Sequence, residues 1–236
     1  PLGTRLPRLR INLRGNGKMS DPAQLSDLEL AALLCSRVCH DVISPVGAIA
    51  NGLEVLEEED DEEMRKMAFD LVRKSANQAS AKLQFCRIAY GAAGSAGAHI
   101  DMGEAGDVAK LFLGDEKVKL DWRAPRETRQ KQQVKILLNL MLMAMSAIPR
   151  GGMVTIEAAG EDLKASARGE QAKLPERTQA LMGGGMESAE IDARLVQVYY
   201  TLRLAEQAGY AISIEQAGQE VILTARPKTS AAAAAA

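Results

Sequence analysis

The chain has 236 residues, of which 47% are hydrophobic and 25% are charged, and its formal net charge is −2. This composition can fill the core of one or two domains, and the near-neutral charge gives no general argument for binding nucleic acid or an acidic membrane surface. No stretch approaches the ~18 consecutive apolar residues of a membrane span, and no apolar signal-peptide core opens the chain, so we expect a cytoplasmic protein.

Both ends of the chain lack a pattern typical of secondary structure. Residues 1–20 are basic and irregular, with scattered Gly and Pro, and we interpret them as a disordered arm or an expression remnant outside the fold. Residues 230–236 form an alanine-rich tail. The folded part is therefore expected to lie between these two segments.

A long amphipathic helix is predicted to follow the arm. Ser26 or Asp27 can cap a helix that starts near Leu28. Apolar residues then recur at spacings of three and four, at Leu34, Val38, Val42, Pro45, Ile49, Leu53 and Leu56. Because the pattern continues beyond Pro45, we expect this proline to kink the helix and not to end it.

His40, one of only two histidines, lies in this helix and away from its apolar side. At about 100° per residue, it is rotated by about 200° from Val38. A core histidine would face the apolar side, and an ordinary solvated surface would carry Lys and Glu. The residues that share the side of His40 are mostly small: Ser36, Arg37, Ser44, Gly47 and Asn51. We therefore expect an exposed histidine that another molecule can approach closely.

A second helix is predicted from about Glu62 to Tyr90. The acidic run Glu57–Glu63 indicates a solvated turn, and its later members favour the N-terminus of that helix. Two long helices joined by a short turn form a hairpin, here spanning 21–92. A lone hairpin buries two apolar stripes poorly, whereas a second copy would complete a four-helix bundle, so we predict a homodimer.

The pattern changes after a Gly-rich boundary, with a linker at 93–99 and a domain of mixed strands and helices at 100–229. His99 lies in the linker, and we expect it to be a structural or surface residue. The elements expected in the domain are a short helix at 106–113, a strand at 118–122, an apolar helix at 131–147, strands at 153–158 and 163–167, a helix at 192–208 and a final hairpin at 211–215 and 220–225.

The three cysteines are too few, and odd in number, for a disulfide framework. We expect Cys35, Cys39 and Cys86 to be buried small apolar residues, because free cysteine behaves as a small hydrophobe. A metal site is the alternative for Cys35 and Cys39, which are one helical turn apart and close to His40.

The motif His40-Asp41-x-x-Ser44-Pro45 resembles the H-box of bacterial sensor histidine kinases, in which an acid follows the phosphorylated histidine and a proline lies five residues on. The run LNLMLMA at 138–144, followed by a Pro-x-Gly-Gly turn, resembles the segment that opens their ATP-binding domain. The resemblance implies a helical hairpin that dimerises into a four-helix bundle, followed by an α/β sandwich domain of the kinase ATP-binding (Bergerat or GHKL) type.

The ATP site departs from the pattern of that family. Met143 stands where the family has a magnesium-binding asparagine, and a thioether is not the hard oxygen ligand that magnesium requires. The stretch that matches the family's Asp-x-Gly-x-Gly motif begins at Ala167 and lacks both the acid and the second glycine. The glycines at 183–185 are followed by three acids that would repel a triphosphate. We therefore expect no bound nucleotide cofactor and no metal.

An intact H-box beside an eroded ATP site is similar to the ChpT-type histidine phosphotransferases. Members of this family are dimers that relay a phosphoryl group from the receiver domain of a hybrid histidine kinase to response regulators, among them CtrA-like and CpdR-like receivers. The resemblance implies a phosphotransferase that forms a phosphohistidine, has no ATP-dependent kinase activity and takes its magnesium from the receiver domain. It implies no direct contact with nucleic acid or membrane.

The same resemblance assigns roles to residues near the motif. His40 would carry the phosphoryl group, and Asp41 would orient the imidazole or act as its general base. The residues expected to contact the partner are Arg37, Ser44, Gly47 and Asn51. Two alternatives stay open: an autophosphorylating histidine kinase with an atypical ATP site, and a non-catalytic module that binds receivers or kinases.

Overall fold

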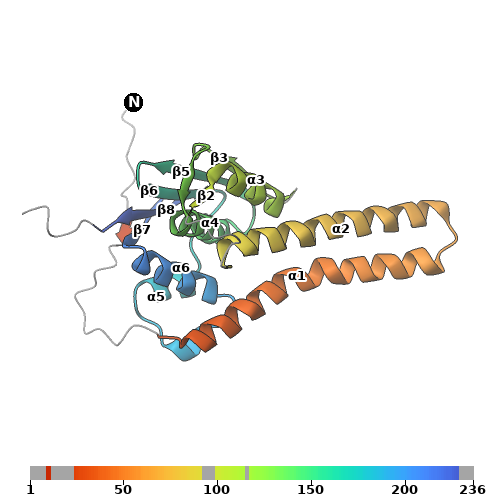
Figure 1. The fold of residues 1–236 in the computed structure, drawn as a ribbon, viewed down its shortest axis with the longest axis horizontal. Helices are drawn as coiled ribbons and strands as arrows, with labels where there is room; N and C mark the ends of the chain where they lie inside the picture. Colours follow the sequence, from red (N-terminus) through yellow and green to blue (C-terminus); the bar gives the residue numbers. More distant parts are fainter. Residues whose placement is uncertain (1–8, 12–23, 92–98, 115–116, 229–236) are drawn as a thin grey trace, which may run out of the picture.

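A computed structural model describes residues 9–11, 24–91, 99–114 and 117–228. A long helical hairpin projects from a domain in which helices cover one face of a sheet (Figure 1). Both the hairpin and the α/β domain agree with the predicted fold class. The predicted linker falls largely on 92–98, and the tail on 229–236, outside the described residues.

Helix α1 spans Asp27–Glu58 and begins at a capping box. The Ser26 hydroxyl accepts a hydrogen bond from the Glu29 N–H, and the Glu29 carboxylate accepts one from the Ser26 N–H. Pro45 lies inside the helix, which continues past it as predicted. The two halves of α1 run in different directions (Figure 1), as expected when an interior proline removes a backbone hydrogen bond.

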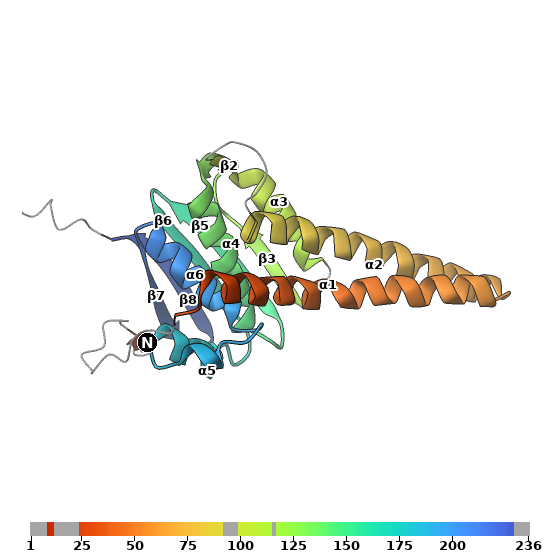
Figure 2. The same cartoon turned by 60° about the horizontal axis from the view of Figure 1, so that its bottom comes forward.

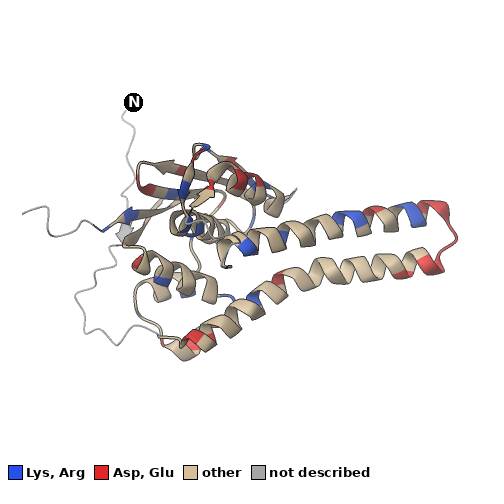
Figure 3. Cartoon of the chain, viewed as in Figure 1, with Lys and Arg blue, Asp and Glu red and all other residues tan. Residues whose placement is uncertain are grey.

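Helix α2 spans Glu62–Ala89 and returns along α1. Asp61 caps it by accepting a hydrogen bond from the Met64 N–H. The tip of the hairpin is acidic, whereas the stretch of α1 between Asp41 and Glu54 has no charged residues (Figure 3). Small buried residues let the two helices approach closely: a Cβ atom at Gly52 would lie 2.6 Å from the Cγ2 atom of Val72. The hairpin is thus held together by close contact between its two helices.

The main sheet has six strands in the order β1-β7-β8-β6-β5-β3, and all neighbours are antiparallel except β3 and β5. The strands are β1 Leu9–Ile11, β3 Val118–Trp122, β5 Gly152–Ala159, β6 Asp162–Arg168, β7 Tyr210–Ala217 and β8 Glu220–Pro227. A separate pair is formed by β2 His99–Asp101 and β4 Thr128–Gln130. Excluding the whole of 1–20 from the fold was wrong for Leu9–Ile11, which pair with β7.

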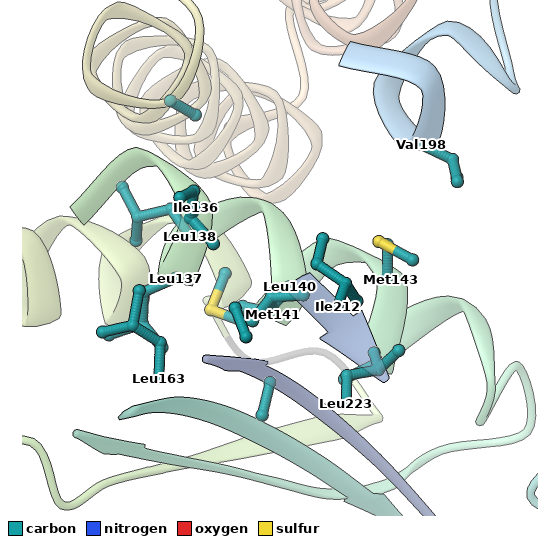
Figure 4. Close-up of a cluster of buried hydrophobic side chains, with 14 of the residues drawn as sticks. Ile136, Leu137, Leu138, Leu140, Met141, Met143, Leu163, Val198, Ile212 and Leu223 are labelled. Atoms are coloured by element: carbon teal, nitrogen blue, oxygen red, sulfur yellow. The ribbon is translucent and has the colours of Figure 1, made fainter. Parts of the chain in front are cut away.

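Helices α3, α4 and α6 lie between the main sheet and the hairpin (Figure 2). The helices of this domain are α3 Met102–Leu113, α4 Lys131–Ser146, α5 Glu176–Met182 and α6 Val196–Gln207, with a 3-10 turn at Ser188–Glu190. Helix α4 is the central element of the core, and its fully buried side chains pack over Leu163 and Leu223 of the sheet (Figure 4). The core therefore lies between α4 and the strands.

The bounds of most elements are close to those predicted, but some elements were missed. Helix α5 and the strands β2 and β4 are too short to show a periodic pattern in the sequence. Helix α3 starts earlier than predicted because Asp101 caps it through the Glu104 N–H. Helix α6 begins at Val196 and not at Asp192, whose carboxylate instead holds the turn before the helix. His99 is exposed, as expected for a surface residue, and begins β2.

One described helix, α1, is long and apolar enough to cross a membrane by length and composition alone. The expectation that no stretch approaches this threshold was therefore wrong. One such helix is weak evidence for a membrane span, and α1 pairs with α2 in the hairpin. Its apolar residues are instead consistent with burial by another protein helix.

Candidate functional site

His40 lies on α1 with 73% of its side chain exposed. The exposed position agrees with the prediction from the helix periodicity. Ser44, Gly47 and Asn51 are also exposed on this helix. A Cβ atom at Gly47 would have no other atom within 4 Å, so packing inside the chain does not require a glycine there. The surface beside the imidazole is therefore formed by small, exposed residues that leave room for another molecule.

The Asp41 carboxylate contacts both the imidazole and a guanidinium. Its Oδ1 atom lies 3.4 Å from Nδ1 of His40, at the long end of the hydrogen-bond range. Its Oδ2 atom accepts a hydrogen bond of 2.9 Å from Nε of Arg37. A proton on Nδ1 that points toward Asp41 leaves Nε2 with a free lone pair. The arrangement can therefore present a neutral, nucleophilic Nε2 to the solvent side.

Arg37 was predicted to face outward toward a partner, but it is bonded within the chain. Only 26% of its side chain is exposed. Besides Asp41, it contacts the α/β domain, where the Arg194 carbonyl accepts a hydrogen bond of 3.5 Å from its NH1 group. Arg37 therefore links the hairpin site to the second domain.

Sequence reasoning missed Lys82, which approaches the site from α2. Its Nζ atom donates a hydrogen bond of 3.1 Å to the backbone carbonyl of Asp41. The only signal in the sequence is that this lysine interrupts the stripe between Ala79 and Cys86, both of which are buried. Lys82 contacts Asp41 because of the register of α2 against α1. That register cannot be predicted from the periodicity of one helix.

Cys86 lies buried near Asp41, as expected for a small apolar residue. Burial raises the pKa of its thiol to about 11, and the negative charge of Asp41 adds to this shift. Cys35 and Cys39 are exposed in the single chain, so the expectation that they are buried was wrong. They lie on a side of α1 that leaves both side chains exposed among the described residues. Among the residues that the structure describes, no cluster of three metal-ligating side chains occurs, and the metal alternative gains no support.

The raised pKa of Cys86 predicts sensitivity to alkali. Because the folded-state pKa of about 11 exceeds the ~8.5 of a free thiol, ionisation favours the unfolded chain. Stability is therefore expected to be intact below about pH 8.5 and to fall as the pH rises further. Urea unfolding at about pH 8 and about pH 10 measures this decline, and Cys86→Ala should reduce it. An equal decline in both proteins would contradict the assignment.

The positions that match the kinase ATP site are filled by packing residues. Met143 of α4 is fully buried in the core of the domain (Figure 4). Asn139, one turn earlier, is also fully buried and donates hydrogen bonds to the backbone carbonyls of Ala89 and Lys135. Ala167 of β6 is buried, and β6 lies between β5, where Val154 is its pairing partner, and β8. None of these side chains offers a free polar group for a nucleotide.

The glycine retained in the altered nucleotide motif serves a packing role. A Cβ atom at Gly169 would lie 2.6 Å from the Gly151 carbonyl oxygen and 2.9 Å from Ile148. The segment between β6 and α6 also points apolar side chains into the core, namely Leu174, Leu181, Met182, Met186 and Ile191. This segment is therefore packed onto the core of the α/β domain.

Comparisons with known proteins agree with this geometry. The family model of the histidine phosphotransferase C-terminal domain matches residues 102–220. The protein phosphotransferase ChpT of Brucella abortus (strain 2308) is 46% identical over 211 residues, which cover 88% of this chain and 100% of that protein. The 1.7 Å structure of a bacterial phosphotransferase superposes with a TM-score of 0.79 at 43% identity, over 88% of this chain and 100% of that one.

A histidine kinase domain of the Erythrobacter litoralis EL346 blue-light activated kinase is a more distant match, with a TM-score of 0.40, 13% identity and coverage of 76% of this chain and 94% of that one. The identity to the Brucella phosphotransferase extends over both the hairpin and the α/β domain. It is supported by the separate match of the C-terminal family model. The chain belongs to the ChpT-type family of histidine phosphotransferases.

Proposed function

We propose that the chain relays a phosphoryl group through His40, from the receiver domain of a hybrid histidine kinase to the receiver domains of response regulators of the CtrA and CpdR type. One observation carries the proposal: an exposed imidazole contacts an aspartate at Nδ1, while the positions of a kinase ATP site are filled by buried side chains. A chain built in this way has a phosphoryl acceptor, while the described side chains at those positions offer no free polar group to a nucleotide.

The relay consists of two transfers at the same atom. In the first, the Nε2 lone pair of His40 attacks the phosphorus of the receiver's aspartyl phosphate, a P–N bond forms and the P–O bond to the aspartate breaks. The proton on Nδ1 stays on the ring, where the charge of Asp41 stabilises the cationic phosphoimidazole. In the second transfer, the aspartate of another receiver attacks the same phosphorus and the imidazole leaves as a neutral ring.

We infer that the magnesium for both transfers comes from the receiver domains, which carry acidic ligands of their own. The described side chains around His40 include one carboxylate, Asp41, and it is engaged by Arg37. Magnesium sites need several oxygen ligands in octahedral geometry. The contribution of this chain is therefore to hold the nucleophile in position.

The open surface beside His40 supports contact with a receiver domain. A glycine inside an exposed helix costs about 1 kcal/mol relative to alanine. Gly47 carries this cost without any contact in the chain that requires it. Ser44 and Asn51 extend the same low surface. Small side chains there would let the receiver bring its phosphorylated aspartate within bonding distance of His40.

We also propose that two copies pair through the hairpin in the cytoplasm. Large apolar side chains are exposed along the hairpin of the single chain, among them Leu28, Val46, Leu53, Phe69 and Leu83. Leu28, Val46 and Leu53 share one face of α1 by their spacing, as do Cys35 and Cys39. A second hairpin packed on this face would complete a four-helix bundle and bury all of them.

Leu53→Glu is expected to convert the dimer to a monomer, because a carboxylate would be buried in the bundle without a partner. Leu53 is 47% exposed in the single chain, so the folded monomer tolerates the change. Leu111→Glu, at a 61% exposed site on α3, is the matched control and should remain dimeric. Sedimentation at micromolar concentration measures both. A wild-type mass equal to one chain would refute the dimer.

The function is tested with a phosphorylated receiver domain as donor and labelled ATP as the competing donor. We expect rapid transfer of label from the receiver to the chain and from the chain to a second receiver, with no label from ATP alone. Label taken directly from ATP would instead support an autophosphorylating kinase. Binding of receivers without any transfer would support a non-catalytic module.

A further inference from the structure

We propose that Asp192, in the turn before α6, is a positioning residue for His40 that acts through the main chain of Arg194 and the guanidinium of Arg37. The inference rests on the proposed function, because it concerns the imidazole that accepts the phosphoryl group. It assigns the α/β domain a part in the chemistry at the hairpin. One continuous chain of polar contacts runs from that domain to the imidazole.

The first part of the chain is the turn that Asp192 builds. Its Oδ1 atom accepts hydrogen bonds of 3.0 Å from the N–H groups of both Arg194 and Leu195. Its Oδ2 atom accepts one of 2.8 Å from NH1 of Arg177, whose NH2 group donates to the Glu190 carbonyl at 2.7 Å. Partial burial raises the pKa of Asp192, but these donors outweigh it and hold the pKa below its usual range. The turn is thus braced from both ends by a charged carboxylate.

The second part of the chain crosses from this turn to α1. The carbonyl of Arg194 accepts a hydrogen bond from NH1 of Arg37 at 3.5 Å, while Nε of the same guanidinium donates to Oδ2 of Asp41 at 2.9 Å. The other oxygen of Asp41 lies 3.4 Å from Nδ1 of His40. A planar guanidinium held by two acceptors restricts the rotation of the Asp41 carboxylate. The position of Arg194 therefore sets where Asp41 meets the imidazole.

This linkage requires that the α/β domain does not move away from the hairpin, and buried polar contacts hold it in place. Asn139 of α4 donates to the Ala89 carbonyl at the end of α2, and Gln197 of α6 donates to Oδ1 of Asn139 at 3.1 Å. Near the start of α1, the Leu25 N–H donates to the Tyr199 hydroxyl at 3.0 Å. Buried groups of this kind are costly to separate, because each would lose its partner. The Arg194 carbonyl is therefore fixed relative to His40.

Additional contacts fix the same junction through a buried cation. Lys135 donates to the Tyr200 hydroxyl at 3.2 Å and to the Tyr90 carbonyl at 3.4 Å. Burial lowers the pKa of Lys135, so the ammonium depends on these acceptors. The end of α2 thus contacts both α4 and α6. This junction between α2, α4 and α6 holds the turn of Asp192 beside α1.

The test compares Asp192→Ala with Glu190→Ala in the full-length chain. Glu190 is the matched control, because its carboxylate also accepts a main-chain N–H, that of Glu187, but is not linked to Arg194. The measured quantities are the maximal rate of transfer from a phosphorylated receiver and the receiver concentration at half that rate. We expect Asp192→Ala to lower the maximal rate about tenfold with the half-saturating concentration unchanged, and Glu190→Ala to change neither.

Non-additivity distinguishes positioning from a purely structural role. In an Arg37→Gln background, Asp192→Ala should cause no further loss of rate, because both changes break the same chain. Asp192→Asn, which keeps an oxygen for the main-chain N–H groups, should lose less than Asp192→Ala. The proposal would be overturned if the losses of rate from Asp192→Ala and Arg37→Gln add fully in the double variant. It would also be overturned if Asp192→Ala lowers the stability of the chain but transfers at the wild-type rate.

A measurement that does not depend on transfer separates this proposal from the proposed function. The ring nitrogen signals of His40, recorded by NMR in the free chain at one fixed pH, should move in Asp192→Ala and not in Glu190→Ala, because the Asp41 contact with Nδ1 changes. If the wild-type chain accepts no phosphoryl group, the proposed function fails but these spectra still test the linkage. Identical His40 ring signals in all three proteins would overturn the linkage itself.

Discussion

His40→Gln is expected to abolish phosphoryl acceptance, with a loss of at least about a thousandfold in the rate of transfer, because an amide has no nucleophilic nitrogen lone pair. The change removes little from the fold, since the imidazole is 73% exposed and its contact with Asp41 is long. Transfer is measured as label that is lost in acid and kept in alkali, the signature of a phosphohistidine.

The chain supplies its own control for this substitution. His99 is the only other histidine, and it is exposed on β2. His99→Gln should transfer at the wild-type rate, and both variants should bind the receiver with unchanged affinity. Label on the His40→Gln chain at the wild-type level would show that another residue carries the phosphoryl group. If cells that carry His40→Gln signal as well as cells with the wild-type chain, the chain would act as a binding module.

Met143→Asn is expected to lower the free energy of unfolding by about 3 kcal/mol and to create no nucleotide binding. The substitution restores the residue type that binds magnesium in the resembling kinases. In this chain the side chain is fully buried among apolar neighbours, so the new amide would have no partner and the apolar contacts would be lost. Urea unfolding measures the cost, and titration with a fluorescent ATP analogue measures binding.

Met143→Leu is the control, because it conserves volume and apolar character and should cost less than about 1.5 kcal/mol. A Met143→Asn chain as stable as the wild type would show that α4 has room for a polar group at this position. ATP binding by that variant would further show that the site was lost by one substitution. Neither result fits a position that lies in the centre of the core (Figure 4).

Much of the fold could be predicted from the sequence because its strongest patterns are local. The capping box at Ser26, the apolar spacing of α1 and the continuation past Pro45 each depend on residues within one or two turns. The start of α6 was predicted too early, because Asp192 closes a turn through the Leu195 N–H and the helix begins only at Val196, four residues after Asp192. The pairing of Leu9–Ile11 with β7 joins segments about two hundred residues apart, and no local pattern contains it.

In the candidate site too, local features could be predicted from the sequence and contacts between elements could not. His40 and Asp41 are adjacent in sequence, and one helix periodicity sufficed to place the imidazole on the exposed side. Arg37 stays a predicted partner contact, and its hydrogen bond to the Arg194 carbonyl of the α/β domain could not be predicted from the sequence of α1. Lys82 contacts the site from α2, and the Arg194 carbonyl contacts Arg37 from the turn before α6, so both contacts depend on packing between elements. Sequence patterns locate the reacting group more readily than the residues that hold it.

The proposed relay through one exposed imidazole, that of His40, also limits how one chain can serve two partners. In the proposed relay, the donor receiver and the acceptor receiver would both reach the same Nε2 atom from the exposed side of α1, so they could not occupy one His40 together. Such an exchange follows a ping-pong order, in which the first partner leaves before the second arrives. An excess of unphosphorylated acceptor would then slow the loading of the relay by competition, and the relative abundance of the two receivers would set the flow of signal.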